Sequence, residues 1–186
     1  IQNNGKNIFT YDGCSSAYNG DGSLVTSAPM YADTFLEFTW DTEANCIIPT
    51  CPPAELPKEP ESVYRALRYG TAKFLQQCGI KRMTVGLSGG IDSAVTAVMY
   101  ADILGPENVL LLNLQLSGLI KENIQARDRG ARVIAAASAA FGGAFSCNSN
   151  KAELAIGYAT FYGDICGAMA MIGDLWKHQV YALGRY

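Results

Sequence analysis

One segment constrains the fold more than any other: an apolar strand that leads through a glycine-rich turn into a helix. Residues 83–87 form the predicted strand, and Ser88-Gly89-Gly90-Ile91-Asp92-Ser93 form the turn. Apolar residues then recur at helical spacing over 94–103, and a second, nearly all-apolar strand follows over 109–114. Strands that are apolar on both faces are typical of parallel sheets. We therefore predict an α/β fold with a parallel sheet and helices on both of its faces.

The rest of residues 61–186 continues this alternation. Apolar residues at helical spacing predict helices over 63–78 and 124–141, and a helix also fits 175–186. A third strand is expected over 144–147.

The front of the chain has a different pattern. Residues 7–41 are β-rich, with strands expected near Ile8–Tyr11, over 24–28 and over 34–40. The sequence Asn19-Gly20-Asp21-Gly22 predicts a hairpin turn, because Asn and Gly tolerate the positive φ of tight turns. Two or three strands cannot bury a core alone, so this part is expected to belong to a larger sheet.

Residues 42–60 are interpreted as a linker. Five of the seven prolines fall between Pro49 and Pro60. Proline removes backbone donors and favours extended geometry, so neither a helix nor a central strand is expected here.

Composition narrows the class of function. Fourteen Lys and Arg against seventeen Asp and Glu give a net charge of -3, which argues against a nucleic-acid partner. No run of eighteen apolar residues exists, so no membrane span is predicted. The six cysteines include no Cys-x-x-Cys pair and His178 is the only histidine, so we expect no zinc site. The cysteines are interpreted as reduced, in a cytoplasmic protein.

The glycine-rich turn is the predicted anion site. Glycines let the backbone approach a ligand closely, and the start of the helix adds partial positive charge. Asp92 would repel a phosphate unless a divalent cation lies between them, so the turn predicts phosphate and Mg²⁺ together. The alternative is an ordinary helix start that Asp and Ser side chains cap. The pattern is neither the Walker A loop nor the dinucleotide fingerprint.

These residues carry a resemblance to a known family. Gly86 to Ser93 resembles the PP-loop of the ATP pyrophosphatases. The segments Glu122–Arg127, Asn150–Asp164 and Asp174–Lys177 are similar to NAD synthetases. In front, Tyr11-Asp12-Gly13-Cys14-Ser15 and the hairpin turn resemble the tail of the nitrilase-like glutaminase domain that precedes the synthetase in the glutamine-dependent form.

The resemblance implies a domain organisation. Residues 1–41 would be the C-terminal remnant of a nitrilase-like α/β domain, residues 42–60 the proline-rich linker, and residues 61–186 an incomplete ATP-pyrophosphatase domain. That domain would have the Rossmann-like parallel sheet of adenine nucleotide alpha hydrolases. Both ends of the sequence are interpreted as internal to a longer protein, and the family carries a longer segment where this chain has Leu114–Lys121.

The resemblance also implies roles for individual residues. Mg²⁺ would be bound by Asp92 and Glu153, and the deamido-NAD substrate by Asn123, Arg127 and Glu153. ATP would be bound by Gly86, Leu87, Ser88, Gly89, Gly90, Ile91, Asp92, Ser93, Asn148 and Lys177. The Glu, Lys and Cys of the glutaminase would precede residue 1, so no catalytic residue is assigned. Other roles remain open: Arg127 could pair with Asp128 or Glu122, and Glu153 and Lys177 could be ordinary surface charges.

The implied function is the ATP-dependent amidation of deamido-NAD to NAD through an adenylylated intermediate. Ammonia would come from glutamine hydrolysed by the upstream domain, and the cofactors would be ATP and Mg²⁺. The family implies a homo-oligomer with small-molecule substrates and neither a nucleic acid nor a membrane as partner. The alternatives are another PP-loop amidotransferase, such as a GMP synthetase, and a non-catalytic nucleotide-binding module.

Overall fold

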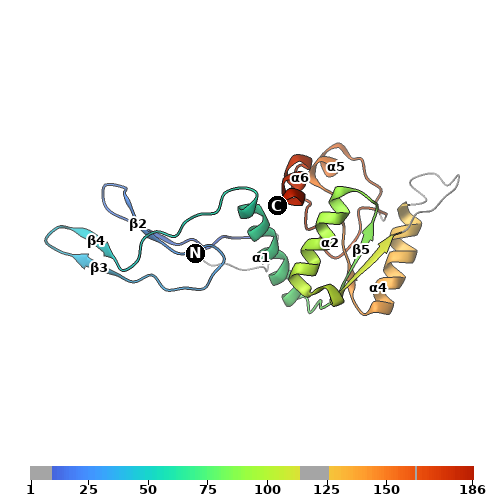
Figure 1. The fold of residues 1–186 in the computed structure, drawn as a ribbon, viewed down its shortest axis with the longest axis horizontal. Coiled ribbons are helices and arrows are strands. Elements are labelled where there is room, and N and C mark those ends of the chain that lie inside the picture. The colour runs from blue at the N-terminus through green and yellow to red at the C-terminus, as the bar shows by residue number, and fades with distance from the viewer. Residues whose placement is uncertain (1–9, 114–125, 162) are drawn as a thin grey trace. The chain divides into compact units, whose positions relative to one another are not determined.

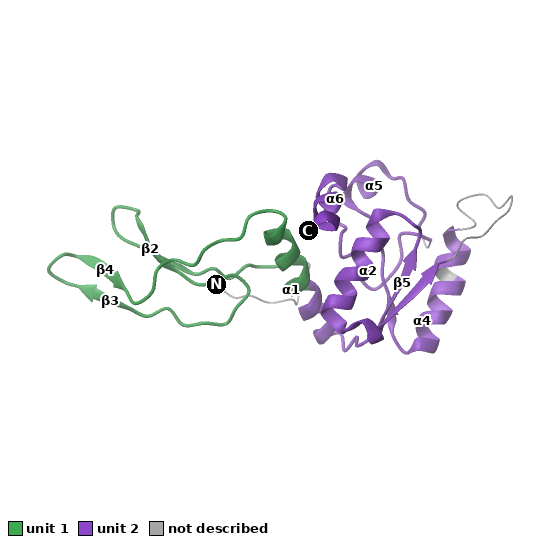
Figure 2. Cartoon of the chain, viewed as in Figure 1, with its two compact units in different colours: residues 1–70 green, residues 71–186 purple. Residues whose placement is uncertain are grey.

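The computed structural model describes residues 10–113, 126–161 and 163–186. The chain forms two compact units, one of residues 1–70 and one of residues 71–186 (Figure 2). The boundary falls inside helix α1, Glu61–Gln77. The predicted helix over 63–78 is therefore confirmed, although it is shared between the units.

The second unit is built on a three-stranded parallel sheet. The strands are β5 (Met83–Leu87), β6 (Val109–Asn113) and β7 (Ala144–Phe145), in the order β6-β5-β7. Met83 pairs with Val109 on one side and with Ala144 on the other. The central strand is the most deeply buried, since Met83 and Val85 have no exposed surface. The predicted α/β fold with a parallel sheet is confirmed.

Helices cover this sheet. Helix α2 (Ile91–Leu104) packs on β5 and β6, and helix α4 (Ala135–Phe141) packs on β7 and β5. Figure 1 shows α2 and α4 on opposite sides of β5. A 3₁₀ turn, Pro106–Asn108, connects α2 to β6, and helix α6 (Lys177–Arg185) packs on α2. Helix α6 begins two residues later than predicted, because the backbone N–H of Trp176 donates to Gln179 Oε1 at 3.0 Å and fixes the helix start there.

Two helical features differ from the predictions. Residues 128–134 form a π-helix, with its hydrogen bonds to the fifth residue along, where the spacing predicted a regular α-helix over 124–141. The first two residues of that prediction lie outside the described part of the chain. Helix α5 (Lys151–Ile156) was not predicted. It has only six residues and depends on its ends, where Asn150 caps the start and Gly157, with φ +71°, allows the stop.

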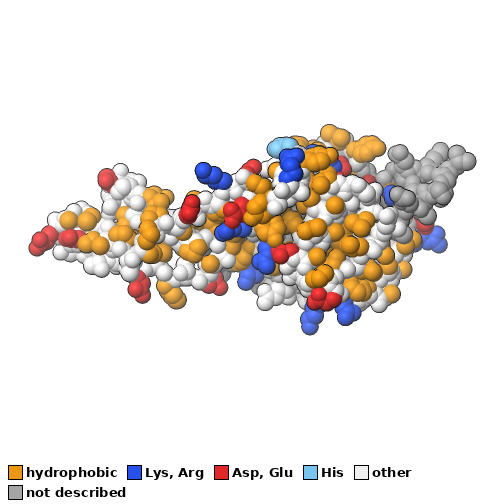
Figure 3. All heavy atoms as spheres, viewed as in Figure 1, with side chains coloured by type: hydrophobic (Ala, Val, Ile, Leu, Met, Phe, Trp, Pro, Cys, Tyr) orange, Lys and Arg blue, Asp and Glu red, His pale blue; other side chains and the backbone are white. Residues whose placement is uncertain are grey.

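The first unit consists of two antiparallel hairpins. Strand β1 (Ser16–Tyr18) pairs with β2 (Leu24–Ser27), and β3 (Phe38–Asp41) pairs with β4 (Cys46–Pro49). The predicted turn at Asn19–Gly22 connects the first pair, with the Gly22 N–H donating to the Asn19 carbonyl at 3.0 Å. Large apolar side chains of this unit are exposed, among them Phe35 at 95% (Figure 3 shows such side chains in orange).

Strand β4 lies inside the range predicted as a linker, so that interpretation is corrected for residues 46–49. The hairpin forms because Asp41 Oδ1 accepts the N–H groups of Glu43 and Ala44, each at 2.9 Å, and reverses the chain. Ile47 and Ile48 then pair with β3, and Pro49 ends the strand. The prolines that argued against structure lie almost entirely beyond this point.

The other strand predictions for this unit are partly met. The strand expected over 34–40 begins only at Phe38. The one expected near Ile8–Tyr11 falls mostly outside the described residues, and its last two positions are not in a strand. None of the helices in the described part of the chain combines the length and the apolar character that crossing a membrane requires.

Candidate functional site

A cavity of about 260 Å³ lies within the second unit, at the carboxyl ends of the parallel strands. Each strand contributes to its wall: Gly86 and Leu87 end β5, Leu112 belongs to β6, and Phe145 ends β7. Ligands of open parallel sheets bind at this edge, because the loops that follow the strands converge there. The cavity is the candidate active site.

The turn from Ser88 to Ser93 forms one side of the cavity. Gly89 has φ +82°, a conformation that side chains with a Cβ rarely adopt. Ser93 is buried, and its hydroxyl donates to the Gly90 carbonyl at 3.0 Å and accepts from the Ser88 N–H at 3.3 Å. The hydroxyl of Ser93 therefore fixes the turn from the inside.

Helix α2 begins at Ile91, and its N-cap residue, Gly90, provides no side-chain cap. The alternative in which Asp or Ser simply caps an ordinary helix start is therefore not what the structure shows. No side chain caps the positive end of the helix dipole at this turn. Anion sites at helix starts have the same arrangement, in which free backbone N–H groups point at the ligand.

Asp92 is the most strongly engaged of the predicted site residues. Its Oδ1 accepts from Asn150 Nδ2 at 3.0 Å, and its Oδ2 forms an ion pair with the Lys177 ammonium. The side chain of Asp92 is only 14% exposed. The two partners come from different elements, so the contact brings together the starts of α2, α5 and α6.

The charge of Lys177 is held in place by this contact. Partial burial lowers the pKa of Lys177, but the hydrogen bond from its ammonium to Asp92 and the charges of Asp92 and Glu153 raise it. The outcome is a pKa above the ordinary value of 10.5. Lys177 does not line the cavity itself; it reaches the site through Asp92.

Glu153 and Asn148 also line the cavity. Glu153 takes part in a capping box, in which its N–H donates to Asn150 Oδ1 at 3.1 Å and its Oε2 accepts from the Asn150 N–H at 3.2 Å. Asn148 connects two strand ends: its amide donates to the Gly86 carbonyl at 2.9 Å and accepts from the Ser146 hydroxyl at 2.8 Å. The structure thus brings Asn148 and Glu153 next to the predicted turn.

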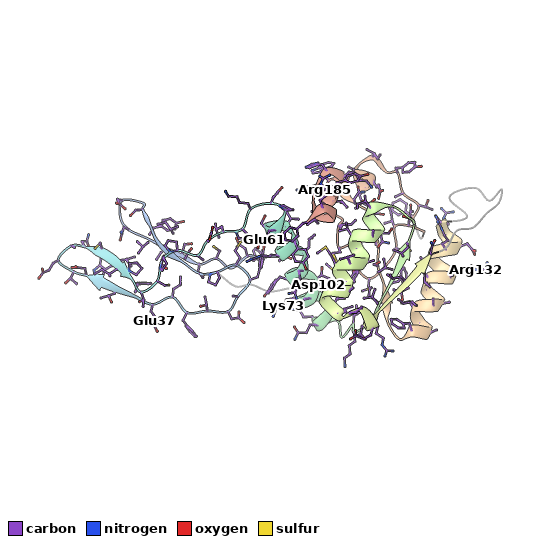
Figure 4. The ribbon with its side chains drawn as sticks, viewed as in Figure 1. Glu37, Glu61, Lys73, Asp102, Arg132 and Arg185 are labelled. Carbon is purple, nitrogen blue, oxygen red and sulfur yellow. The ribbon has the colours of Figure 1, made fainter. Side chains whose placement is uncertain are left out.

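Arg127 is not brought together with Asn148 and Glu153 on the cavity wall. Its side chain is exposed, does not line the cavity and donates to the Phe161 carbonyl at 3.3 Å. The alternative pairing with Asp128 is not observed, because Asp128 pairs with Arg132 at 3.1 Å on the helix surface (Arg132 is labelled in Figure 4). Asn123 and Glu122 lie outside the described residues.

Of the predicted turn residues, Gly89, Gly90 and Ile91 do not line the cavity themselves. Ile91 has a packing role instead. It is the first residue of α2, and its side chain packs toward Gly184 of α6, where an added Cβ would lie 2.8 Å from Ile91 Cδ1. Its contribution is to the packing of α6 on α2.

Several residues on the cavity wall or directly behind it were not predicted from the sequence. Arg129 lines the wall two residues after Arg127, and Asn150 lies buried behind Asp92 and Glu153. Cys166 also lines it; burial, with the nearby Cys147 and Asp164, raises the pKa of its thiol. The second arginine of the Arg-x-Arg pattern at 127–129 was the signal for Arg129. Asn150 was marked by the cap pattern Asn-x-x-Glu.

The side chains present fit a magnesium ion. Mg²⁺ in nucleotide sites takes one or two carboxylates together with phosphate oxygens. Asp92 and Glu153 both line the cavity, and the Lys177 ammonium already occupies a cation position on Asp92. Residues 10–113, 126–161 and 163–186 contain no cluster of three or more acidic, Cys or His side chains that could hold a metal without such phosphates.

Comparison with known proteins identifies the family. The family model described as NAD synthase matches residues 63–118 and 112–186. A glutamine-dependent NAD(+) synthetase from Synechocystis is 30% identical over 98% of this chain and 41% of the relative. The chain thus spans less than half the length of that relative. Their alignment extends over 229 positions, more than the 186 residues here, so the relative carries additional residues.

Two solved structures share the fold. The glutamine-dependent NAD+ synthetase from Acinetobacter baumannii, in complex with ADP, matches the whole chain with a TM-score of 0.89 at 24% identity, over 43% of its own length. The NH3-dependent NAD synthetase from Campylobacter jejuni, in complex with the nitrate ion, matches 68% of this chain and 72% of its own with a TM-score of 0.60 at 26% identity. Three observations agree on the family. The family model matches most of the second unit, the Synechocystis relative is 30% identical, and the PP-loop turn lies at the carboxyl edge of a parallel sheet. The chain belongs to the NAD synthase family.

Proposed function

We propose that this chain is the ATP-pyrophosphatase part of a glutamine-dependent NAD synthetase. It would adenylylate the nicotinate carboxylate of deamido-NAD and allow ammonia to displace AMP. The observation that carries the proposal is the cavity, in which the glycine-rich turn, Asn148 and two carboxylates converge in a chain of this family. The names of the longer relatives support glutamine as the nitrogen source.

The turn from Gly86 to Ser93 would bind the ATP phosphates. Its uncapped helix start and glycine backbone suit an anion, and the ADP complex of the Acinetobacter relative supports an adenine nucleotide as ligand. Asn148 lies at the adjacent strand end, in reach of the same ligand.

Asp92 and Glu153 would hold Mg²⁺ beside the phosphates. When bound, the ion would offset the charge that develops on the departing pyrophosphate. The Lys177 ammonium would also offset this charge. It pairs with Asp92 and would turn from there toward a phosphate oxygen. The pKa of Lys177 lies above its ordinary value of 10.5, so this group is charged at neutral pH.

The deamido-NAD substrate would lie on the other side of the cavity. Arg129, rather than Arg127, provides a guanidinium on the cavity wall for an anionic group of this substrate. Arg127 and Asn123 would also bind this substrate; Asn123 lies outside the described residues. Glu153, which lines the cavity, would contact both the Mg²⁺ ion and the deamido-NAD substrate.

The reaction itself needs two displacements. The nicotinate carboxylate is a poor electrophile, so one of its oxygens first attacks the α-phosphorus of ATP and pyrophosphate leaves. Ammonia then attacks the acyl carbon, AMP leaves with that oxygen, and one proton of the ammonia is lost. Ammonia at neutral pH is mostly protonated, so a route from the upstream domain that keeps it neutral is part of the proposal.

The proposal also covers the rest of the protein. It includes assembly as a homo-oligomer, a cytoplasmic location and the origin of residues 1–41 as the remnant of a nitrilase-like domain.

An acceptor assay tests this function. The complete natural protein is supplied with ATP, Mg²⁺ and glutamine or ammonia, and AMP and NAD are measured with deamido-NAD as acceptor. We expect both products from either nitrogen source. AMP formed only with xanthosine monophosphate would indicate another PP-loop amidotransferase. ATP binding without AMP from any acceptor would indicate a non-catalytic nucleotide-binding module.

A further inference from the structure

Asn150 is a fully buried polar residue in the middle of the candidate site. Its side chain has no exposed surface, although its neighbours are charged groups that face the cavity. Burying an amide costs free energy unless both of its ends are hydrogen-bonded. Both ends of this amide are hydrogen-bonded: the nitrogen to Asp92 and the oxygen to Glu153.

The amide nitrogen holds Asp92. Asn150 Nδ2 donates to Asp92 Oδ1 at 3.0 Å, while Asp92 Oδ2 carries the Lys177 ammonium. The two oxygens of this carboxylate therefore have separate functions, and only Oδ2 is offered to a cation.

The amide oxygen holds Glu153. Asn150 Oδ1 accepts from the Glu153 N–H at 3.1 Å, and the Asn150 N–H donates back to Glu153 Oε2 at 3.2 Å. The adjacent Lys151 N–H donates to the Leu175 carbonyl at 2.9 Å, just before α6 and Lys177. Asn150 thus contacts Asp92 and Glu153 directly, and Lys177 is joined to it through Asp92.

Only a side chain with both a donor and an acceptor can make these contacts. Carboxylates accept but do not donate, so Asp92 and Glu153 cannot hold one another. A serine or threonine could still accept from Glu153 N–H as an N-cap, but it is too short to reach Asp92 as well. Replacing Asn150 by serine or threonine therefore keeps the cap of α5 but removes the hydrogen bond to Asp92.

We propose that Asn150 is a positioning residue that sets the orientation of Asp92 and Glu153 for binding one divalent cation together with the ATP phosphates. This inference rests on the proposed function, since it takes MgATP as the ligand. Partners that orient metal-binding side chains typically change metal affinity or activity about 10- to 100-fold when they are removed.

The test uses binding rather than turnover. Calorimetry on the complete natural protein measures the affinity for α,β-methylene-ATP as a function of Mg²⁺ concentration, and again in EDTA. The variants are Asn150→Ser and Asn150→Thr, which both keep a cap for α5; the second fills more space if the first does not fold. The control is Asn108→Ala, which removes a 2.9 Å hydrogen bond from an asparagine amide to the Leu104 carbonyl, in the 3₁₀ turn between α2 and β6.

We expect the half-saturating Mg²⁺ concentration to rise about 10-fold or more in the Asn150 variants. Affinity in EDTA should stay close to that of the wild type, and the control should match the wild type in both conditions. An unchanged Mg²⁺ dependence, or an equal weakening with and without Mg²⁺, would overturn the positioning role and leave Asn150 as a structural cap. A wild-type protein that does not bind the analogue at all would overturn the proposed function and this inference with it.

Discussion

At the scale of single residues, Asp92 has the most constrained role. Its carboxylate is mostly buried and touches both an amide and an ammonium. We predict that Asp92→Asn lowers the rate of pyrophosphate release on the order of 100-fold, because the charge that attracts Mg²⁺ and Lys177 is lost while the shape is kept. Glu107→Gln, an exposed position in the 3₁₀ turn, should leave the rate unchanged. Normal turnover in Asp92→Asn would remove this residue from the mechanism.

The pair of Lys177 with Asp92 predicts a pH dependence of stability. The folded pKa of Lys177 lies above the unfolded value of 10.5, so the contribution is fully present below pH 10.5 and is lost as the pH rises through the folded pKa. The side chain is 42% exposed, so we expect about 1 kcal/mol or less. Urea unfolding should show a constant difference between wild type and Lys177→Met at neutral pH that shrinks only in strongly alkaline solution. A difference that already falls near neutral pH would contradict the assignment.

Cys166 offers a chemical probe of the cavity. Burial raises the pKa of its thiol, and the thiolate is the reactive form. Mass spectrometry after iodoacetamide treatment near neutral pH should show slower labelling of Cys166 than of the exposed Cys51 and Cys78. MgATP should slow labelling of Cys166 further, since this residue lines the cavity, without protecting the other two. Equal labelling of Cys166 with and without nucleotide would place the nucleotide elsewhere.

At the scale of elements, two glycines set how the loop after α5 packs on the π-helix. A Cβ added to Gly130 would lie 2.4 Å from the Gly163 carbonyl oxygen, a backbone atom that cannot easily move. Alanine normally favours a helix by up to about 1 kcal/mol over glycine. The clash costs more, so Gly130→Ala should lower the free energy of unfolding by roughly 1–2 kcal/mol in urea titration.

Gly20→Ala is the matched control for that substitution. Gly20 lies in the hairpin turn with open space around its Cβ position, and the change should alter stability by less than about 0.5 kcal/mol. An unaffected Gly130→Ala variant would show that the loop can move away from the helix at little cost.

The alternation of apolar strands and helices was enough to predict β5, α2 and β6, since burial on both faces leaves a strong signal in the sequence. Strand β4 and helix α5 were missed for local reasons. Four residues of β4 lie next to a run of prolines, and the turn at Asp41 that creates the hairpin depends on a side-chain contact. The six residues of α5 are too few for apolar periodicity, so only the Asn150 cap marked this helix.

At the scale of the whole molecule, residues distant in sequence meet because parallel strands end at one edge. That rule, together with the family resemblance, predicted that Asn148, Glu153 and the turn lie together, and in the structure they line one cavity. The resemblance named Arg127 and not Arg129, which lines the cavity. The π-helix at 128–134 begins directly after Arg127 and includes Arg129.

Oxygen transfer tests the central claim most directly. The complete natural protein is given ATP, Mg²⁺, ammonia and deamido-NAD carrying ¹⁸O in its nicotinate carboxylate, and the products are analysed by mass spectrometry. Adenylylation of that carboxylate predicts NAD together with AMP that has gained one ¹⁸O. AMP without the label, or no NAD at all, would contradict the assignment of this site as one that activates deamido-NAD.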